Sequence, residues 1–404
     1  MDAETAARQP RIAFVSGLGF GGATTFLCCL AGEIVRRRIP VIIISPEREN
    51  AFAADFKTSG VEVVLHDDRR MIFEDRMAAM LQRLAAFQPT TVISCLGQGA
   101  YEILRYLPEG VRRFAMIHTD HPTVYAALAP YAAHIDDIVG VSRQITTRLE
   151  GMEVFHTASK RYLRHGITVP QDFQPREMHN RPLRLLYFGR LSNGQKRVYL
   201  FPTILAGLKQ AGIPFQWTIV GEGDQRATLE HAMHSNVPGQ KIIFADSVSY
   251  HQVPALLQNQ DVFLLASDAE GLPLSLLEAM GHGLVPVISN LESGVREVVD
   301  SSNGMLVEVN NLEGYAQAII YLHNNRPELA AKSAAAHARV QVEFSVEAMA
   351  DRWLGVLTQS ETRKVSWPPR PTIHPPKELS KRAWFRPAWR PLRRLLKTMA
   401  PSKP

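Results

Sequence analysis

Two glutamates flank an apolar run in the second half of the chain. In SDAEGLPLSLLEAMGHGLVPVIS, residues 267–289, Glu270 and Glu278 lie eight positions apart among mostly apolar neighbours. An unpaired carboxylate is costly to bury, whereas a carboxylate at a binding site is a strong hydrogen-bond acceptor. The pair therefore indicates ligand binding, although the spacing alone also occurs in helices with a purely structural role.

The strand that precedes Glu270 places this residue at the edge of the sheet where ligands bind. The strand expected in VFLLAS ends just before Glu270, and open α/β sheets bind ligands at the carboxyl ends of their strands. Pro273 suits the first turn of the helix that carries Glu278, and Gly271 permits close backbone approach. The N-terminus of that helix offers N–H groups and a positive dipole end to a phosphate.

A second glycine-rich turn lies near the start of the chain. RIAFVSG is a short apolar strand that ends in glycine, and the apolar residues of LGFGGATTFLCCLAGEIVRRR then recur at helical spacing. The pattern predicts a strand, a turn containing Gly19, Gly21 and Gly22, and a helix. These glycines alone are also consistent with a tight turn that binds nothing.

The same alternation continues along the chain. In the first half we expect strands at residues 41–45, 61–66, 91–96, 113–119 and 137–142. In the second half we expect them in LRLLYFGRL, QWTIVGEG, KIIFAD, VFLLAS, VPVIS and GMLVEV. Near-continuous apolar strands alternating with helices indicate parallel sheets covered on both faces. We therefore predict an α/β protein with two Rossmann-like domains.

A polar, proline-rich stretch after Arg164 separates the two regions. VPQDFQPREMHNRP has no periodicity and is typical of a linker. We expect a first domain over 1–170, a second over 171–344, a closing helix over 345–360 and a basic Pro/Trp-rich tail over 361–404.

The composition is that of an ordinary globular protein, with 46% hydrophobic and 21% charged residues among 404. No apolar run approaches the roughly 20 residues that span a bilayer, and the polar start MDAETAARQPR is unlike a signal peptide. We therefore expect a cytoplasmic protein. Cys28, Cys29 and Cys95 show neither a disulfide framework nor metal-ligand spacing, and we interpret them as core thiols.

The net charge of +6 belongs to the tail. Residues 363–404 contain twelve Lys or Arg and one acidic residue, which leaves 33 basic and 38 acidic residues in the rest of the chain. Such a tail can be a solvated charge run, a segment that binds nucleic acid, or a segment whose Trp and Arg side chains bind an anionic membrane surface. We favour the membrane and expect no nucleic acid.

The sequence EGLPLSLLEAM, followed by GHGLVPV and SGVREVV, closely resembles the paired-glutamate motif of the family-4 retaining glycosyltransferases (glycosyl transferases group 1). GFGGATTFL, GRLSNGQK, VGEGDQR and NGMLVE resemble other parts of the family pattern, which covers the chain to about residue 359. The resemblance implies the GT-B fold, in which two Rossmann-like domains face each other across a cleft. It also implies a nucleotide-diphosphate sugar as co-substrate and no cofactor.

The resemblance further implies residue roles. Glu270 would accept hydrogen bonds from the donor sugar, and Glu278 would hold the ribose hydroxyls of the nucleotide. Arg190 and Lys196 would neutralise the diphosphate, for which a guanidinium beside an ammonium is chemically suited. Backbone groups that would contact the donor belong to Gly21, Gly22, Gly271, Leu272, Pro273 and Leu274.

His118, at the end of the strand FAMIHT, resembles the family histidine that faces the reacting sugar, although a histidine at a strand end is often only structural. His121 is a weaker candidate for a contact with the acceptor. We interpret Asp268, His282 and Arg226 as structural.

Two departures from the family pattern concern the acceptor side. Ala23 and Thr24 stand where a glutamate often follows the first Gly-Gly, and Arg-His-Gly at 164–166 stands where Pro-Asn-Gly is common. Arg197 replaces a common glycine and is either a third phosphate contact or the start of a helix.

The chain contains no Asp-x-Asp motif, so we expect no metal; cations and helix dipoles would stabilise the leaving diphosphate. The family retains anomeric configuration, which implies same-face attack without a covalent nucleophile. The leading hypothesis is thus a metal-independent retaining glycosyltransferase acting on a cell-envelope glycan or lipid-linked acceptor, peripheral to the inner face of the cytoplasmic membrane. The alternatives are a sugar-nucleotide epimerase or phosphorylase on the same fold, and a non-catalytic scaffold that binds a nucleotide sugar or membrane.

Overall fold

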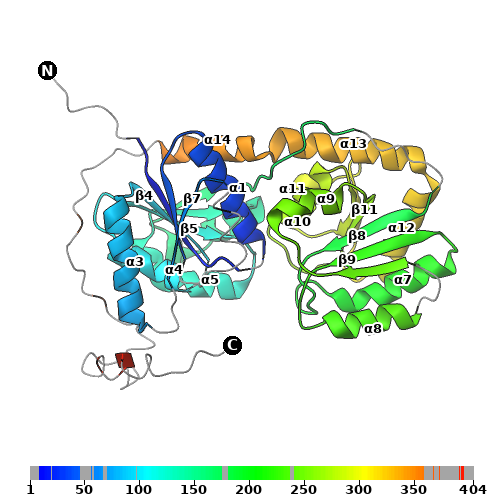
Figure 1. The fold of residues 1–404 in the computed structure, drawn as a ribbon, viewed down its shortest axis with the longest axis horizontal. Helices are drawn as coiled ribbons and strands as arrows, with labels where there is room; N and C mark the ends of the chain where they lie inside the picture. The colour runs from blue at the N-terminus through cyan, green and yellow to red at the C-terminus, as the bar shows by residue number, and fades with distance from the viewer. Residues whose placement is uncertain are drawn as a thin grey trace.

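The chain folds into two α/β domains that lie side by side (Figure 1). The computed structural model describes residues 9–19, 21–45, 56, 59–66, 71–96, 98–174, 181–236, 241–358, 367, 373, 391 and 393–394. Among these residues, no helix combines the length and the apolar character needed to cross a membrane.

The first domain is built on a seven-stranded sheet in the order β3-β2-β1-β4-β5-β6-β7, with every paired neighbour parallel. Its central strands consist of buried apolar residues on both faces, as a sheet covered by helices requires. The strands are β1 (Ile12–Ser16), β2 (Val41–Ser45), β3 (Glu62–Leu65), β4 (Thr91–Leu96), β5 (Arg112–Ile117), β6 (Asp137–Gly140) and β7 (Ser159–Tyr162).

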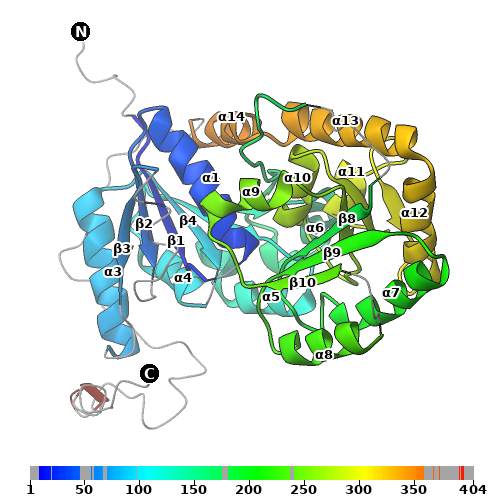
Figure 2. The ribbon, with the colours of Figure 1, turned by 45° about the vertical axis from the view of Figure 1, so that its right-hand side comes forward.

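Helices connect these strands. They are α1 (Gly22–Arg36), α3 (Phe73–Phe87), α4 (Gln98–Glu102), α5 (Pro122–Leu128) and α6 (Arg143–Glu150), with 3-10 turns η2 (Ile103–Tyr106), η3 (Ala129–His134) and η4 (Glu153–Phe155). Helix α1 follows the first glycine turn, as the sequence predicts, and it lies beside α10 (Leu274–Gly281) of the second domain (Figure 2).

The second domain is built on a six-stranded sheet in the order β10-β9-β8-β11-β12-β13, again with parallel neighbours. Its strands are β8 (Leu183–Phe188), β9 (Phe215–Val220), β10 (Lys241–Ala245), β11 (Val262–Leu265), β12 (Val285–Ser289) and β13 (Met305–Val307). Besides α10, its helices and turns are η5 (Val198–Leu200), α7 (Phe201–Gln210), α8 (Arg226–Asn236), η6 (Tyr250–Gln252), α9 (Val253–Leu257), α11 (Gly294–Val298), α12 (Leu312–Asn324) and α13 (Arg326–Glu343). The prediction of two Rossmann-like domains is confirmed.

Helix α14 (Val346–Leu357) returns the chain to the first domain, where it packs on α1 (Figure 1). The Ser345 side chain caps its N-terminus by accepting a hydrogen bond from Ala348 N. Its buried side chains recur at helical spacing, and Trp353 is fully buried near Phe26 of α1, with ring centroids 6.1 Å apart.

The chain crosses between the domains twice, and the two crossings touch. Ile167 on the outgoing segment bridges Ser345 on the returning one, with Ile167 N donating to Phe344 O at 2.9 Å and Val346 N donating to Ile167 O at 2.8 Å. Gly166 is required there, because an added Cβ would lie 2.4 Å from the carbonyl oxygen of Ser345.

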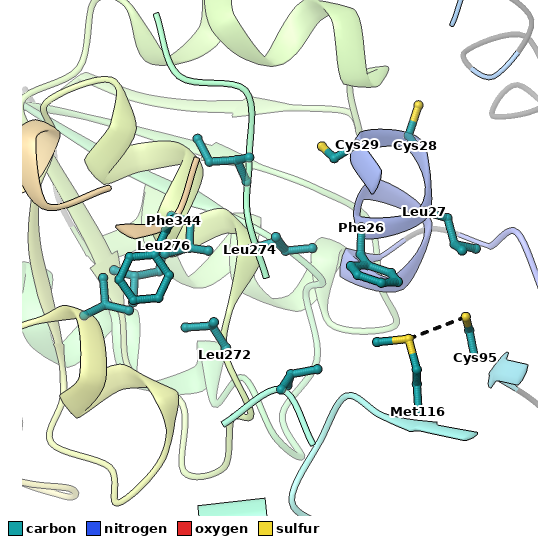
Figure 3. Close-up of a cluster of buried hydrophobic side chains, with 14 of the residues drawn as sticks. Phe26, Leu27, Cys28, Cys29, Cys95, Met116, Leu272, Leu274, Leu276 and Phe344 are labelled. Carbon is teal, nitrogen blue, oxygen red and sulfur yellow. Dashed lines mark hydrogen bonds between the residues drawn. The ribbon is translucent and has the colours of Figure 1, made fainter. Parts of the chain in front are cut away.

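The three cysteines are buried and free, in agreement with their interpretation as core thiols. Figure 3 shows side chains of α1, including Phe26 and Cys29, in one buried cluster with Leu272 and Leu274 of the second domain. The apolar core therefore continues from one domain to the other.

The tail contributes a described contact to the first domain. Arg393 is 3% exposed and donates two hydrogen bonds, of 2.6 and 3.2 Å, to the carboxylate of Glu74 near the N-terminus of α3. Arg394 pairs with the neighbouring Asp75. The aromatic residues Trp384, Phe385 and Trp389, on which the membrane interpretation depends, lie outside the described residues.

Candidate active site

Glu270 and Lys196, predicted to act on the same ligand, are in direct contact. Lys196 Nζ donates to Glu270 Oε1 at 2.6 Å, and the two side chains are 16% and 6% exposed. Gln195 Nε2 donates to the other carboxylate oxygen at 3.2 Å and to the carbonyl oxygen of Ala269 at 2.7 Å. The loop of residues 189–196, called the basic loop below, is thus joined to the loop that carries Glu270. This ion pair explains how a largely buried carboxylate is accommodated here.

Close backbone packing holds the basic loop against the end of β9. Leu191 N donates to Glu222 O at 2.8 Å, and Gly221 and Gly223 have φ of 142° and 159°. An added Cβ on either glycine would lie 2.0 Å from a carbonyl oxygen of the basic loop, so only glycine fits.

Arg190 lies in the same loop, with an exposed side chain. Its carbonyl oxygen accepts a hydrogen bond of 2.6 Å from the Tyr187 hydroxyl, which fixes the loop backbone. No hydrogen bond among the described residues joins its guanidinium to Glu270 or Glu278. The structure therefore brings Lys196, but not the Arg190 side chain, to a glutamate.

Glu278 is buried in α10, and burial raises the pKa of its carboxyl to about 8. Its charge also contributes to the raised pKa values of Cys29 and Tyr250, for which burial is the main cause. The Tyr250 hydroxyl lies 3.1 Å from Cys29 Sγ and 3.2 Å from Thr168 Oγ1. Glu278 therefore lies where α1, the interdomain segment and the second domain meet.

Two glycines mark the interdomain seam, which we define by Gly22, His118, Gly271 and Leu274. An added Cβ on Gly271 would lie 2.1 Å from the carbonyl oxygen of His118, and one on Gly22 would lie 3.3 Å from Leu274 Cδ1. Gly21 caps α1 with φ 145°, a conformation that favours glycine. Gly22 and Gly271 thus permit close approach between the two domains.

His118 lies at the seam with its ring turned inward. Its ring is edge-on to Phe26, with centroids 5.5 Å apart, and stacks on His165 at 5.3 Å. Burial lowers the pKa of His118 to about 4, so the imidazole is neutral near pH 7. Its Nε2 atom is buried and has no hydrogen-bond partner among the described residues.

The weaker candidates have local roles. His121 is exposed and caps α5 by accepting from Thr123 N at 3.4 Å. Arg226 donates to two backbone carbonyl oxygens, and His282 contacts the carbonyl oxygen of Glu278. Arg197 begins η5 with φ 51° and hydrogen-bonds Tyr199 and Asn310.

Sequence reasoning missed three contributors to this region. Gln195 lies inside the recognised basic loop, yet nothing in the pattern indicated its contact with Glu270. Tyr250 follows a weakly patterned segment and gave no signal. His165 did give a signal, because the Arg-His-Gly sequence at 164–166 departs from the family pattern.

Two facing Rossmann-like domains with a basic loop and a paired-glutamate helix at their seam define the GT-B class of protein. Residues 169–339 match the family model described as Glycosyl transferases group 1. This match covers the second domain of the chain.

Individual relatives of similar sequence are also named as glycosyltransferases. The amylovoran biosynthesis glycosyltransferase AmsK of Erwinia amylovora is 30% identical over 177 residues, 42% of this chain and 43% of AmsK. The putative colanic acid biosynthesis glycosyltransferase WcaL of Escherichia coli K12 is 30% identical over 187 residues, 44% of this chain and 45% of WcaL. These matches span less than half the length of either relative.

Among solved structures, that of Anabaena HepE in complex with UDP and glucose superposes with a TM-score of 0.70 at 17% identity. It covers 87% of this chain and 100% of that chain. At this identity the likeness shows the shared fold.

Proposed function

We propose that this chain is a retaining glycosyltransferase that moves a sugar from a nucleotide-diphosphate sugar to a cell-envelope glycan or lipid-linked acceptor, without a metal ion. The observation that carries the proposal is the Lys196–Glu270 ion pair beside the interdomain seam. It places a cation suited to a diphosphate against a carboxylate suited to sugar hydroxyls, at a point that both domains reach.

The donor would bind by exchanging this ion pair. A diphosphate would draw the ammonium of Lys196 to itself, with Arg190 as a second cation, and would free Glu270 to accept hydrogen bonds from the sugar. The α10 N-terminus, reached through Gly271 to Leu274, adds N–H groups and a positive dipole end. Gly22, which contacts Leu274, brings α1 to the same phosphates.

Glu278 would hold the ribose hydroxyls. Its buried carboxyl lies one turn into α10, so a nucleotide whose phosphates meet the start of that helix presents its ribose nearby. His118 would contact the transferred sugar from the first domain.

The chemistry would consist of positioning and charge stabilisation. Lys196, Arg190 and the helix dipole would stabilise the departing diphosphate, which takes up the acceptor's proton on the same face of the sugar. The acceptor oxygen bonds to the anomeric carbon on the face from which the diphosphate departs, and the sugar–phosphate bond breaks, so the anomeric configuration is retained.

The choice of acceptor is supported by the relatives. AmsK and WcaL are named as glycosyltransferases of amylovoran and colanic acid biosynthesis. The basic tail would bring the enzyme to anionic lipid at the inner face of the cytoplasmic membrane, where each basic residue near the surface contributes about 1 kcal/mol.

The test is a thermal-shift screen of UDP- and GDP-sugars with excess EDTA, followed by transfer assays with the donors that bind. A donor at 100 times its Kd should stabilise the fold by about 2.7 kcal/mol. Glu278→Gln should abolish the shift. NMR of the product should show the donor's anomeric configuration.

Other outcomes separate the alternatives. Turnover of the donor without an acceptor, or with consumption of inorganic phosphate, would indicate an epimerase or phosphorylase. Binding without transfer to any acceptor would indicate a scaffold. For the tail, a chain ending at Ser360 should float poorly with anionic liposomes compared with the full chain; equal flotation contradicts the membrane role.

A further inference from the structure

Two histidines from different parts of the chain form a stacked pair at the seam, His118 half-buried and His165 buried. The rings of His118, which follows β5, and His165, on the outgoing interdomain segment, are 5.3 Å apart at an angle of 17°. His118 Nδ1 lies 3.4 Å from His165 Nε2, a long hydrogen bond between the two rings. The remaining nitrogens, His118 Nε2 and His165 Nδ1, are buried without a partner among the described residues.

Both rings are neutral near pH 7. Burial lowers the pKa of His118 to about 4, and burial together with the neighbouring ring lowers the pKa of His165 well below its ordinary value. Each neutral imidazole carries one N–H, and one of the two must be donated within the pair. Two arrangements are therefore open.

In the first arrangement, His165 Nε2–H donates to His118 Nδ1. His118 then carries its proton on Nε2, which has no acceptor within the part of the chain that the structure describes, and His165 Nδ1 is a bare acceptor. In the second, His118 Nδ1–H donates to His165 Nε2. His165 Nδ1–H is then a buried donor.

The surroundings of His165 separate these arrangements. Its ring is 2% exposed and lies 4.9 Å from the centroid of Phe26, while the next residue, Gly166, packs against Ser345 and Met349. An orphaned N–H in such an apolar setting is rare in proteins, whereas an acceptor without a partner is better tolerated. Each arrangement leaves one buried donor without a partner among the described residues. In the second it lies on His165, in the interdomain segment; in the first it lies on His118, which belongs to the seam where the proposed ligand would bind.

We propose that His165 is a positioning residue that holds His118 as the Nε2–H tautomer, so that His118 donates a hydrogen bond to an oxygen of the sugar substrate and does not act as a base. His118 then recognises a hydroxyl or phosphate oxygen as an acceptor. Nothing in this role requires His165 to touch the substrate.

The inference rests on the proposed function for the sugar that His118 would contact. The tautomer of His118 can nevertheless be measured without any transfer reaction. In full-length protein labelled with ¹⁵N-histidine, two-bond ¹H–¹⁵N correlation reports which nitrogen of each ring is protonated. His118→Gln identifies the signals of His118 by their disappearance. We expect His118 as a single Nε2–H tautomer in the wild-type protein.

Two substitutions of His165 separate its hydrogen bond from its packing. His165→Phe keeps an aromatic ring for the stack and removes the donor, so His118 should become a mixture of tautomers. His165→Gln retains an N–H at a similar reach and should restore the Nε2–H form. His156→Phe, which changes an exposed histidine, is the matched control and should leave the His118 signals unchanged.

Kinetics supply the second readout. With a donor identified by the thermal-shift screen, His165→Phe should lower kcat at least about tenfold, because a misplaced contact to the reacting sugar costs activity, and His165→Gln should recover most of it. Binding of UDP or GDP alone should change little, because His118 contacts the sugar.

Clear results would overturn the inference. An Nδ1–H tautomer of His118 in the wild-type protein, or an unchanged tautomer in His165→Phe, contradicts it whether or not transfer is observed. A wild-type protein without transferase activity contradicts the proposed function but leaves the tautomer assignment to be decided by the spectrum alone.

Discussion

The carbonyl oxygen of His118 lies 2.1 Å from the point where a side chain on Gly271 would begin. The two residues belong to different domains, so this backbone contact sets how closely the domains approach beside the candidate active site. A glycine of the paired-glutamate motif is therefore also a packing residue of the interdomain seam.

Gly271→Ala should push the domains apart at this point, because backbone atoms on both sides leave little room to adjust. We expect an increased radius of gyration in solution scattering and a loss of at least about tenfold in transfer, since misplacement by 1 Å can cost a hundredfold. Gly355→Ala, where an added Cβ meets nothing within 4 Å, is the control and should leave both unchanged. Unaltered scattering and activity in Gly271→Ala would show that the seam is not limiting.

Lys196→Met should destabilise the fold because it leaves the Glu270 carboxylate, 6% exposed, without its cation. Removing one partner of a buried ion pair costs about 3 kcal/mol, measurable by urea denaturation. The double variant Lys196→Met, Glu270→Gln should recover most of this loss while still failing to bind the donor in calorimetry. Recovery of donor binding in the double variant would contradict the assigned roles.

Glu278 should make stability depend on pH. Its pKa is about 8 in the folded protein and near 4.5 when unfolded, so between these values the folded state binds more protons. The free energy of unfolding should therefore fall as pH rises through this window, by up to about 1.4 kcal/mol per unit from this group. Glu278→Gln should remove that contribution, seen as a flatter pH profile in urea denaturation.

The same carboxyl predicts a proton linkage to nucleotide binding. Ribose hydroxyls that donate to Glu278 favour its ionised form and lower its pKa. Binding of UDP or GDP near pH 7 should then release protons, which appears in calorimetry as a binding enthalpy that varies with the ionisation enthalpy of the buffer. An enthalpy independent of the buffer would argue against a contact between the ribose and Glu278.

The tail should contribute to stability through one arginine. Arg393→Met leaves Glu74, whose side chain is 4% exposed, without its partner and should lower the free energy of unfolding by about 3 kcal/mol. Arg394 is 53% exposed, so Arg394→Met should cost about 1 kcal/mol or less. Equal effects of the two substitutions would contradict the buried pairing.

The sequence was informative where periodicity was strong. The strands near residues 41–45 and 91–96 have the expected bounds, because continuous apolar runs leave little choice of register. β7 (Ser159–Tyr162) was not predicted: its sequence is polar, and it forms by pairing with β6 at the edge of the sheet. Such an edge strand depends on its neighbour more than on its own composition.

The candidate site also contains residues that the sequence predicts and contacts that only the structure shows. The sequence singles out Glu270, Glu278 and Lys196 because each stands in a motif that is local in sequence. The contact between Gly271 and His118 and the stacking of His165 on His118 join residues far apart in the chain, and only the assembled domains bring them together. No spacing rule encodes such pairs.

The return of α14 to α1 has a consequence for synthesis. The sheet of the first domain emerges from the ribosome early, but the helix that covers Phe26 with the fully buried Trp353 emerges only after the whole second domain. Domains generally fold as units in the order of their synthesis. Here the domain that is begun first is completed last, so until residue 357 has been translated the nascent chain presents an uncovered apolar face that chaperones can bind.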